Sequence, residues 1–370
     1  MKYTKILSTA LLTAAILSNA ALAADTKQIF DFEKNNGSFT PIFADYPAGS
    51  GVDEFYELKH EWAVSPTKDG KALFLLGNNH SDDLFMGYYK EIGGLTAGQL
   101  YEFQVSFRLA TDVEDGMIGV GGSPGSSVYV KGGVTAEQPQ RSANEQNNYR
   151  LNIDKGNQGA GGRDMLLLGN LEKEDEQHPG EYEWKEFKFT MQAKANENGS
   201  VYLILGSDSG FEATSSYYLD DISVSWTEKQ ETAITRGAAI QMMYDSILPP
   251  AGKAPTFVDV GADSPYRTAI GWAQEKGIVS GYGADRFGAD DPLTTAQALT
   301  VLYRYAGSPA VSESNVDLSD LPAWAKNAAE WALQNGIVSE ADLRYDSVMS
   351  EYAFTRAWQS IPKEQTEHVF

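Results

Sequence analysis

The C-terminal half of the chain contains an internal repeat. Residues 271–280 read GWAQEKGIVS, and residues 330–339 read EWALQNGIVS, 59 positions later. Residues 234–244 and 293–303 are similar to each other at the same offset of 59. A shared offset in two separate segments predicts repeated structural units. Units this short must pack on each other to bury their apolar side chains.

Each full unit is predicted to hold two helices. In the middle unit the first apolar stripe consists of Tyr266, Ala269, Ile270 and Ala273, and the second of Ala298, Leu299, Leu302 and Tyr303. These spacings place each set on one helix face. Gly277 is expected to end the first helix, and Thr294 to cap the second. Trp272 and Trp331 lie beside the stripes, so we expect them to pack between units rather than to stack on sugar.

The middle unit resembles the S-layer homology domain. The resemblance rests on residues 257–260 (FVDV), on residues 277–282 (GIVSGY) and on the helix from Thr294 to Arg304. Residues 229–370 are accordingly assigned to an all-α, S-layer-homology-like repeat domain, with a partial unit at 232–252, a full unit at 255–308 and a degenerate unit at 315–365. The resemblance implies a bundle of three units that binds secondary cell-wall polysaccharide, often pyruvylated, in grooves between the units.

The same resemblance implies which residues contact the polymer. The second helix of the family begins with a Thr-Arg-Ala-Glu motif, whose arginine matches Arg236 and, in letters, Arg356, whereas Thr295 takes this position in the middle unit. Pro362 follows Arg356 closely, so Met349-Ser350 is an alternative start for the last helix. The acidic and aromatic residues that precede the first helices complete the expected set, which is Asp259, Tyr266, Asp320 and Trp324.

The N-terminal half of the chain has the sequence pattern of strands rather than of helices. Between residues 24 and 228, strand-like runs are separated by clusters of Gly, Asn, Asp and Pro. Tyr101, Phe103, Val105 and Phe107 alternate with other residues along one such run. This pattern predicts an all-β, antiparallel sandwich. Residues 112–178 are rich in Gly, Asn, Gln and acidic side chains, and we expect them to form a long insertion with one or two extra strands.

The two ends of this half resemble the galactose-binding-like jelly roll of many carbohydrate-binding modules. They read IFDFE at residues 29–33 and YYLDDISV at residues 217–224. The resemblance implies a glycan-binding domain whose first and last strands adjoin and share a structural Ca²⁺. Glu33, Asp220 and Asp221 are the expected ligands, because carboxylate oxygens suit Ca²⁺. Ordinary polarity at strand ends is the alternative interpretation.

Charge and composition narrow the partners. The chain has 29 Lys and Arg against 51 Asp and Glu, and its net charge of −22 disfavours nucleic acid and anionic membranes as partners. Residues 1–23 are interpreted as a secretory signal peptide, because Lys2 and Lys5 precede an apolar run and residues 21–23 (ALA) offer a cleavage site. That run is too short to span a membrane. The absence of cysteine excludes disulfides and thiolate metal sites.

Catalytic motifs are weak. Residues 121–125 (GGSPG) fit the Gly-x-Ser-x-Gly pattern, but a strand-like run follows where a nucleophile elbow needs a helix. The four histidines lack the spacing of a zinc protease. We therefore expect a secreted bacterial cell-surface protein without enzyme activity, anchored noncovalently to cell-wall polysaccharide, whose sandwich binds glycan. A surface-attached glycan-active enzyme and a structural S-layer component are the alternatives.

Overall fold

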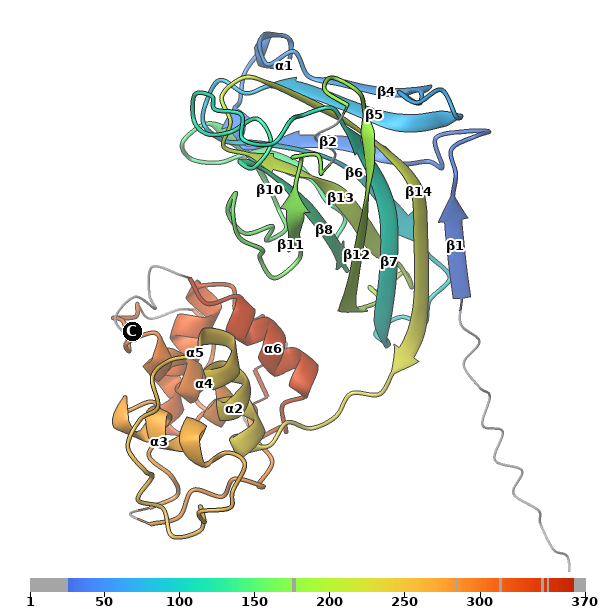
Figure 1. The fold of residues 1–370 in the computed structure, drawn as a ribbon. Coiled ribbons are helices and arrows are strands. Elements are labelled where there is room, and N and C mark those ends of the chain that lie inside the picture. Colours follow the sequence, from blue (N-terminus) through green and yellow to red (C-terminus); the bar gives the residue numbers. More distant parts are fainter. Residues whose placement is uncertain are drawn as a thin grey trace, which may run out of the picture.

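The computed structural model describes residues 26–362, except 175–177, 284, 313–314, 341–342 and 345. The predicted signal peptide, residues 1–23, lies outside the described residues. Strands occupy the chain from residue 26 to residue 229, and helices follow from residue 236 (Figure 1). None of the described helices has the length and apolar character that a membrane span requires.

Two antiparallel sheets form the N-terminal region (Figure 1). The first has the order β12 (Glu183–Lys194), β7 (Leu100–Thr111), β14 (Thr214–Lys229), β5 (Lys71–Asn78) and β4 (Lys59–Val64), and β1 (Thr26–Phe30) pairs with β14. The second has the order β11 (Leu166–Asn170), β8 (Val128–Thr135), β13 (Val201–Ser209), β6 (Leu84–Ile92) and β2 (Thr40–Ala44). A small sheet of β3 (Tyr46–Pro47), β10 (Asn148–Leu151) and β9 (Arg141–Ala143) and the short helix α1 (Val52–Phe55) complete the region.

One apolar core joins the two large sheets. The alternating residues of β7 are all buried in it, and the second sheet contributes Met86, Val130, Leu203 and Leu205 to the same cluster. The predicted all-β sandwich is therefore confirmed. The first and last strands also adjoin as expected, because Phe30 of β1 lies opposite Ile222 of β14.

The segment 112–178 differs from the expected insertion. It holds β8, β9, β10 and β11, and β8 is an interior strand between β11 and β13. Lys131 and two glycines interrupt the apolar alternation of β8, so the sequence indicated a short apolar run here but not an interior strand of this length. Both glycines are required by space: a Cβ on Gly132 would come within 2.6 Å of the Phe189 ring, and one on Gly133 within 1.9 Å of the Asp164 carbonyl oxygen.

Lys131 belongs to a buried network of charged side chains in the sandwich. Its ammonium group lies 2.8 Å from Asp208 Oδ2, and neither side chain has any exposed surface. Lys155 contacts the same Asp208 oxygen and lies 2.8 Å from Asp45 Oδ2. Lys131 also donates to the carbonyl oxygens of Lys155 and Ala160. These partners compensate for the desolvation of charges that would otherwise be costly to bury.

Replacing Asp208 by Asn should destabilise the sandwich strongly, because it leaves two buried ammonium groups short of a counter-charge. We expect the free energy of unfolding to fall by about 3–5 kcal/mol, as for other broken buried pairs. Glu186→Gln is the control: its pair with Lys188, at 2.9 Å, is more than half exposed on both sides, so less than about 1 kcal/mol should be lost. Chemical denaturation measures both values, and similar small losses would contradict the network's role.

A ring of three backbone hydrogen bonds organises the C-terminal region. The Ile234 N–H donates to the Met349 carbonyl (3.0 Å), the Met349 N–H to the Leu293 carbonyl (2.9 Å), and the Leu293 N–H to the Ile234 carbonyl (2.9 Å). Three helices begin two residues after these positions: α2 (Arg236–Ile247), α4 (Thr295–Tyr305) and α6 (Glu351–Gln359). The repeated segments therefore meet around one pseudo-threefold centre.

Each of these helices is capped by a hydroxyl side chain. Thr235, Thr294 and Ser350 each accept a hydrogen bond from the backbone N–H three residues further on. The expected cap at Thr294 is confirmed. Ser350 caps the last helix, which begins at Glu351, so the alternative start at Met349-Ser350 is confirmed as well. The match between Arg356 and the arginine of the family motif is a register error, because Arg356 lies in the second turn of α6.

Two outer helices pack on this arrangement. α3 (Arg267–Glu275) packs on α2, and α5 (Ala323–Gln334) packs on α4. Trp272 meets Tyr244 with ring centroids 5.8 Å apart, and Trp331 meets Tyr303 at 5.7 Å. Both tryptophans are 1% exposed, which confirms their expected packing role. Residues 230–235 contain no helix, so the first unit supplies no outer helix to pack on α6.

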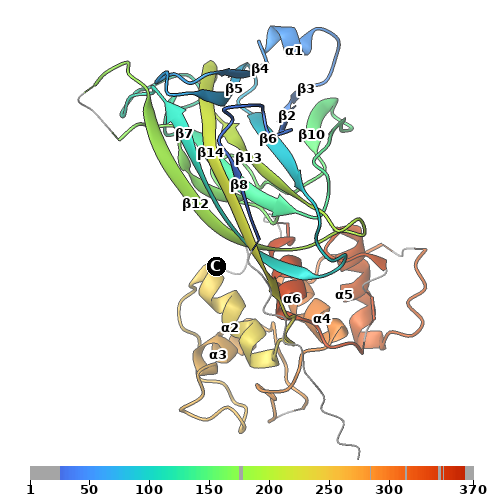
Figure 2. The ribbon, with the colours of Figure 1, turned by 90° about the vertical axis from the view of Figure 1, so that its right-hand side faces the viewer.

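The sandwich contacts α6 instead. Arg356 lies 2.7 Å from Asp164 Oδ1 and donates to the Arg163 carbonyl, while the Arg163 side chain donates to Ser360 Oγ. The Glu351 N–H donates to the Thr232 carbonyl of the linker (2.8 Å). Burial tends to raise the pKa of Asp164, but Arg356 and Arg163 outweigh it and lower that pKa. Figure 2 shows β14 leading from the sandwich directly into the helical region.

Candidate functional sites

Arg236 occupies the first position of α2. Its Nε donates to the Phe287 carbonyl (2.9 Å), and its guanidinium carbon lies 4.4 Å from the Tyr282 ring centroid and 4.8 Å from that of Phe287. The residue is 9% exposed. Its two terminal nitrogens make no hydrogen bond to the described residues, and neither is among the buried atoms without a partner. The guanidinium is therefore held by its ring contacts with its forked end available to a ligand.

Acidic side chains shape the surroundings of Arg236. Asp259 accepts hydrogen bonds from the backbone N–H groups of Phe287 (2.8 Å) and Gly288 (2.7 Å). Desolvation acts to raise the pKa of Asp259, but these hydrogen bonds prevail and lower it. Burial lowers the pKa of Arg236. Arg286 pairs with Asp291 at 2.9 Å. A forked guanidinium can bind a carboxylate through two hydrogen bonds, which suits an acidic ligand.

The other two helix starts lack this guanidinium. Thr295 follows the cap of α4, and its hydroxyl lies 3.0 Å from Ser347 Oγ. Glu351 follows the cap of α6, and its N–H is bonded to Thr232 of the linker. Of the three equivalent positions, only that of Arg236 presents a cation.

Tyr266 lies close to the same site. A Cβ on Gly237, the residue after Arg236, would come within 2.4 Å of the Tyr266 ring, so the glycine allows the ring to lie against α2. The structure thus brings Arg236, Asp259 and Tyr266 to one region, which we call the Arg236 site.

Comparison with known families identifies the segment that carries most of this site. Residues 256–299 match the S-layer homology domain. The match covers Asp259, Tyr266 and Phe287, together with α3 and the beginning of α4. No curated protein matched the chain.

Solved structures similar to the N-terminal region include modules of glycan-degrading enzymes. The CBM22-1 and GH10 modules of Clostridium thermocellum xylanase 10B, complexed with xylohexaose, are 15% identical with a TM-score of 0.27, covering 58% of this chain and 31% of that chain. The CBM22-2 xylan-binding domain of Paenibacillus barcinonensis Xyn10C is also 15% identical, with a TM-score of 0.27 and coverages of 54% and 99%. A C-terminal CBM6 from Zobellia galactanivorans is 13% identical, with a TM-score of 0.23 and coverages of 54% and 99%. We take the sandwich architecture from the sheet order and the core.

The remaining residues expected to bind polymer lie apart from the Arg236 site. Asp320 lies just before α5 and Trp324 in its first turn, and Trp324 is 55% exposed. Arg356 points to the sandwich, where its ion pair with Asp164 gives it a role in docking the two regions. Sequence letters placed Arg356 in the family motif because Thr355 precedes it, but the cap at Ser350 sets the true register.

Two of the three expected calcium ligands, Asp220 and Asp221, form ion pairs with an arginine. Asp220 and Asp221 lie at an irregularity in β14, and both contact Arg108 of β7, at 3.2 Å and 2.7 Å. Burial raises the pKa of Asp220 to about 6. Among the described residues, the acidic trio with oxygens within 4.8 Å of one another is Asp45, Asp83 and Asp208, and it does not include Glu33, Asp220 or Asp221. Lysines and Arg150 pair with that trio.

Calcium at Glu33, Asp220 and Asp221 stays a prediction, and thermal melts of the mature chain test it. With free Ca²⁺ at about 100 times its dissociation constant, bound metal would add roughly 2.7 kcal/mol of stability. Melting in Ca²⁺ and in chelator should then differ by several degrees, and Glu33→Gln should abolish the difference whereas Glu186→Gln should not. Superimposable melts of the unaltered chain would contradict bound calcium and leave the two aspartates with their ion pairs to Arg108.

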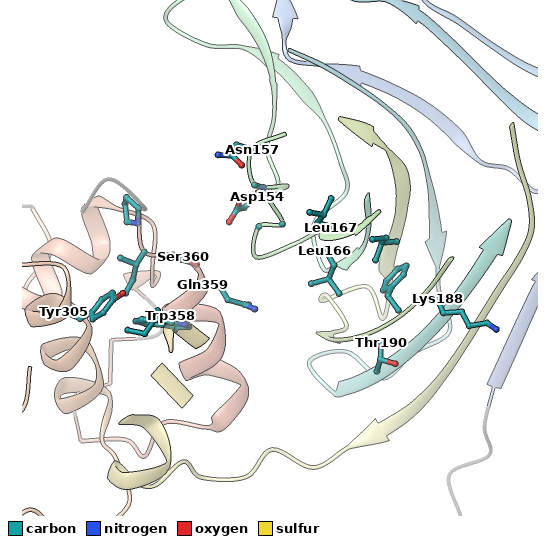
Figure 3. Close-up of a pocket in the computed structure, with 18 residues that line it drawn as sticks. Asp154, Asn157, Leu166, Leu167, Lys188, Thr190, Tyr305, Trp358, Gln359 and Ser360 are labelled. Atoms are coloured by element: carbon teal, nitrogen blue, oxygen red, sulfur yellow. Dashed lines mark hydrogen bonds between the residues drawn. The ribbon is translucent and has the colours of Figure 1, made fainter. Parts of the chain in front are cut away.

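A third candidate site, which the sequence did not indicate, lies between the sandwich and the helices. A cavity of about 1090 Å³ is lined by side chains from both regions (Figure 3). Asp154, Asn157 and Leu166 come from the sandwich, and Tyr305, Trp358 and Gln359 from the helices. We call this cavity the interdomain cleft.

Proposed function

We propose that the chain is a secreted bacterial surface protein held noncovalently on the cell wall by its S-layer-homology-like repeats. The observation that carries the proposal is the Arg236 site: a single forked guanidinium, in contact with two aromatic rings, at one of three equivalent helix starts. The expected ligand is secondary cell-wall polysaccharide bearing a carboxylate, such as a pyruvyl ketal. The S-layer homology match over residues 256–299 supports this polymer class.

The three helix starts are proposed to differ in function. Arg236 provides the principal contact, with Asp259 and Tyr266 beside it. Thr295 and Glu351 carry no positive charge that could attract an acidic polymer. The Thr295 hydroxyl contacts Ser347, and the Glu351 N–H donates to the linker to the sandwich. Asp320 and Trp324 are proposed as an accessory surface on the last unit.

The sandwich is proposed to be a glycan-binding domain without catalytic activity. Its antiparallel two-sheet architecture supports this role, and so does the resemblance of its first and last strands to carbohydrate-binding modules. Two alternatives have distinct signatures. A glycan-active enzyme would release reducing sugars from wall polysaccharide, whereas a structural surface-layer component would form ordered arrays visible by electron microscopy.

Arg236→Ala should weaken binding of the mature chain to wall sacculi, because it removes the fork that pairs with the carboxylate. Loss of a charge-assisted hydrogen bond of about 1.5–3 kcal/mol corresponds to roughly a tenfold to hundredfold lower affinity. Arg236→Lys keeps the charge and should show a partial loss. Arg304→Ala changes the net charge equally outside the Arg236 site and is the matched control. Co-sedimentation with sacculi measures all four proteins, and circular dichroism checks that each is folded.

Two results would overturn the anchoring proposal. One is that the unaltered chain stays in the supernatant with sacculi that retain their secondary polymer. The other is that Arg236→Ala and Arg304→Ala bind equally well. Sacculi whose ketal pyruvate has been removed by mild acid should bind the unaltered chain as weakly as untreated sacculi bind Arg236→Ala.

A further inference from the structure

We infer that the interdomain cleft is a second, independent saccharide-binding site, suited to a neutral oligosaccharide. It lies between α6 and the strands β11 and β12 of the sandwich (Figure 3). Its volume of about 1090 Å³ is at the upper end for small-molecule sites, and domain interfaces are a common location for such sites. Arg236 does not line it.

The repeat explains why this cleft is open. Tyr244 and Tyr303 each lie nine residues after a helix cap, and each is covered by a tryptophan from an outer helix. The equivalent residue of α6, nine positions after Ser350, is Gln359. The first unit has no outer helix to cover it. The side of α6 that carries Gln359 therefore faces the sandwich across the cleft, with a polar residue where the other units have an aromatic one.

The helical wall of the cleft combines an aromatic surface with free polar groups. Trp358 packs against Tyr305 with ring centroids 4.6 Å apart. The Trp358 indole N–H and the Gln359 amide make no hydrogen bond to the described residues, and neither is among the buried atoms without a partner. Figure 3 shows the Gln359 side chain extending toward the sandwich.

The opposite wall is also polar. The Asn157 side-chain amide has no hydrogen-bond partner among the described residues, and Asp154 directs its two carboxylate oxygens to the N–H groups of Gly156 and Arg163. Each of those oxygens retains a lone pair for a further donor. The charged residues of the lining are Asp154 and Lys188, and the Lys188 ammonium group is already paired with Glu186, so no unpaired cation of the lining favours an anionic ligand.

These features fit a neutral saccharide better than a protein partner. Sugar rings present C–H faces that pack on aromatic rings, and their hydroxyl groups both donate and accept hydrogen bonds. An apolar helix would leave the amides of Asn157 and Gln359 without partners, at a cost in desolvation. The ion pair of Arg356 with Asp164 and the bond from Arg163 to Ser360 hold the two walls in place before any ligand binds.

The test is calorimetric titration of the full mature chain with xylohexaose, cellohexaose and the hexamer of N-acetylglucosamine. At least one of these neutral β-linked probes should bind. Gln359→Ala and Asn157→Ala should each weaken that binding about twofold to tenfold, the range of one neutral hydrogen bond. Trp358→Ala should weaken it more. Phe55→Ala removes an exposed aromatic ring outside the cleft and should leave that binding unchanged.

Oligosaccharide binding in the cleft can be distinguished experimentally from wall anchoring at the Arg236 site. Arg236→Ala should retain oligosaccharide binding while losing sacculus binding, because Arg236 lies outside the cleft lining. The inference is overturned if none of the three probes binds, or if binding is unaffected by both Gln359→Ala and Asn157→Ala. Concentration-dependent dimerisation that these two substitutions abolish would also overturn it, since a second copy of the chain would then be the occupant.

Discussion

The helical region depends on three backbone hydrogen bonds that join the residues before its inner helices. Ile234, Leu293 and Met349 each donate to the carbonyl of the next member, so three distant segments are held in one ring. The cap that follows each ring residue fixes where its helix starts, and therefore which side chain occupies the first helical position. Arg236 owes its place to this register. The ring therefore places three equivalent helix starts around one centre, of which that of Arg236 carries a cation and those of Thr295 and Glu351 do not.

The sandwich and the helical region are in contact at α6, where the first unit supplies no outer helix. No outer helix from the first unit covers α6, and the linker and the sandwich occupy its neighbourhood instead. Thr232 accepts a backbone hydrogen bond from Glu351, and Asp164 pairs with Arg356. The interdomain cleft has the same origin. The sandwich lies where an outer helix would pack on α6, and its sheet edge does not fill the space that such a helix would fill. The absence of a helix from residues 230–235 therefore accounts for both the docking contact and the cavity.

Residue spacing and capping motifs predicted the helices and strands. The sites were harder to predict, because their residues contact partners that are far away in the sequence. The helix that follows Thr294 and the strand around Phe103 were evident, because spacing and capping are local properties. The length and interior position of β8 were not evident, because Lys131 within it is buried by groups far away in sequence, above all Asp208. The contacts of Asp220 and Asp221 with Arg108, and of Arg356 with Asp164, also join distant segments. No periodicity in the sequence indicates such pairs.

We propose that one of the three helix starts, that of Arg236, binds polymer. The most direct measurement is the stoichiometry of binding between the mature chain and a soluble, pyruvylated fragment of secondary wall polymer, by isothermal titration. We expect one fragment bound per chain, with binding lost in Arg236→Ala. Two or three equivalent fragments per chain, or one fragment whose binding survives that substitution, would contradict it.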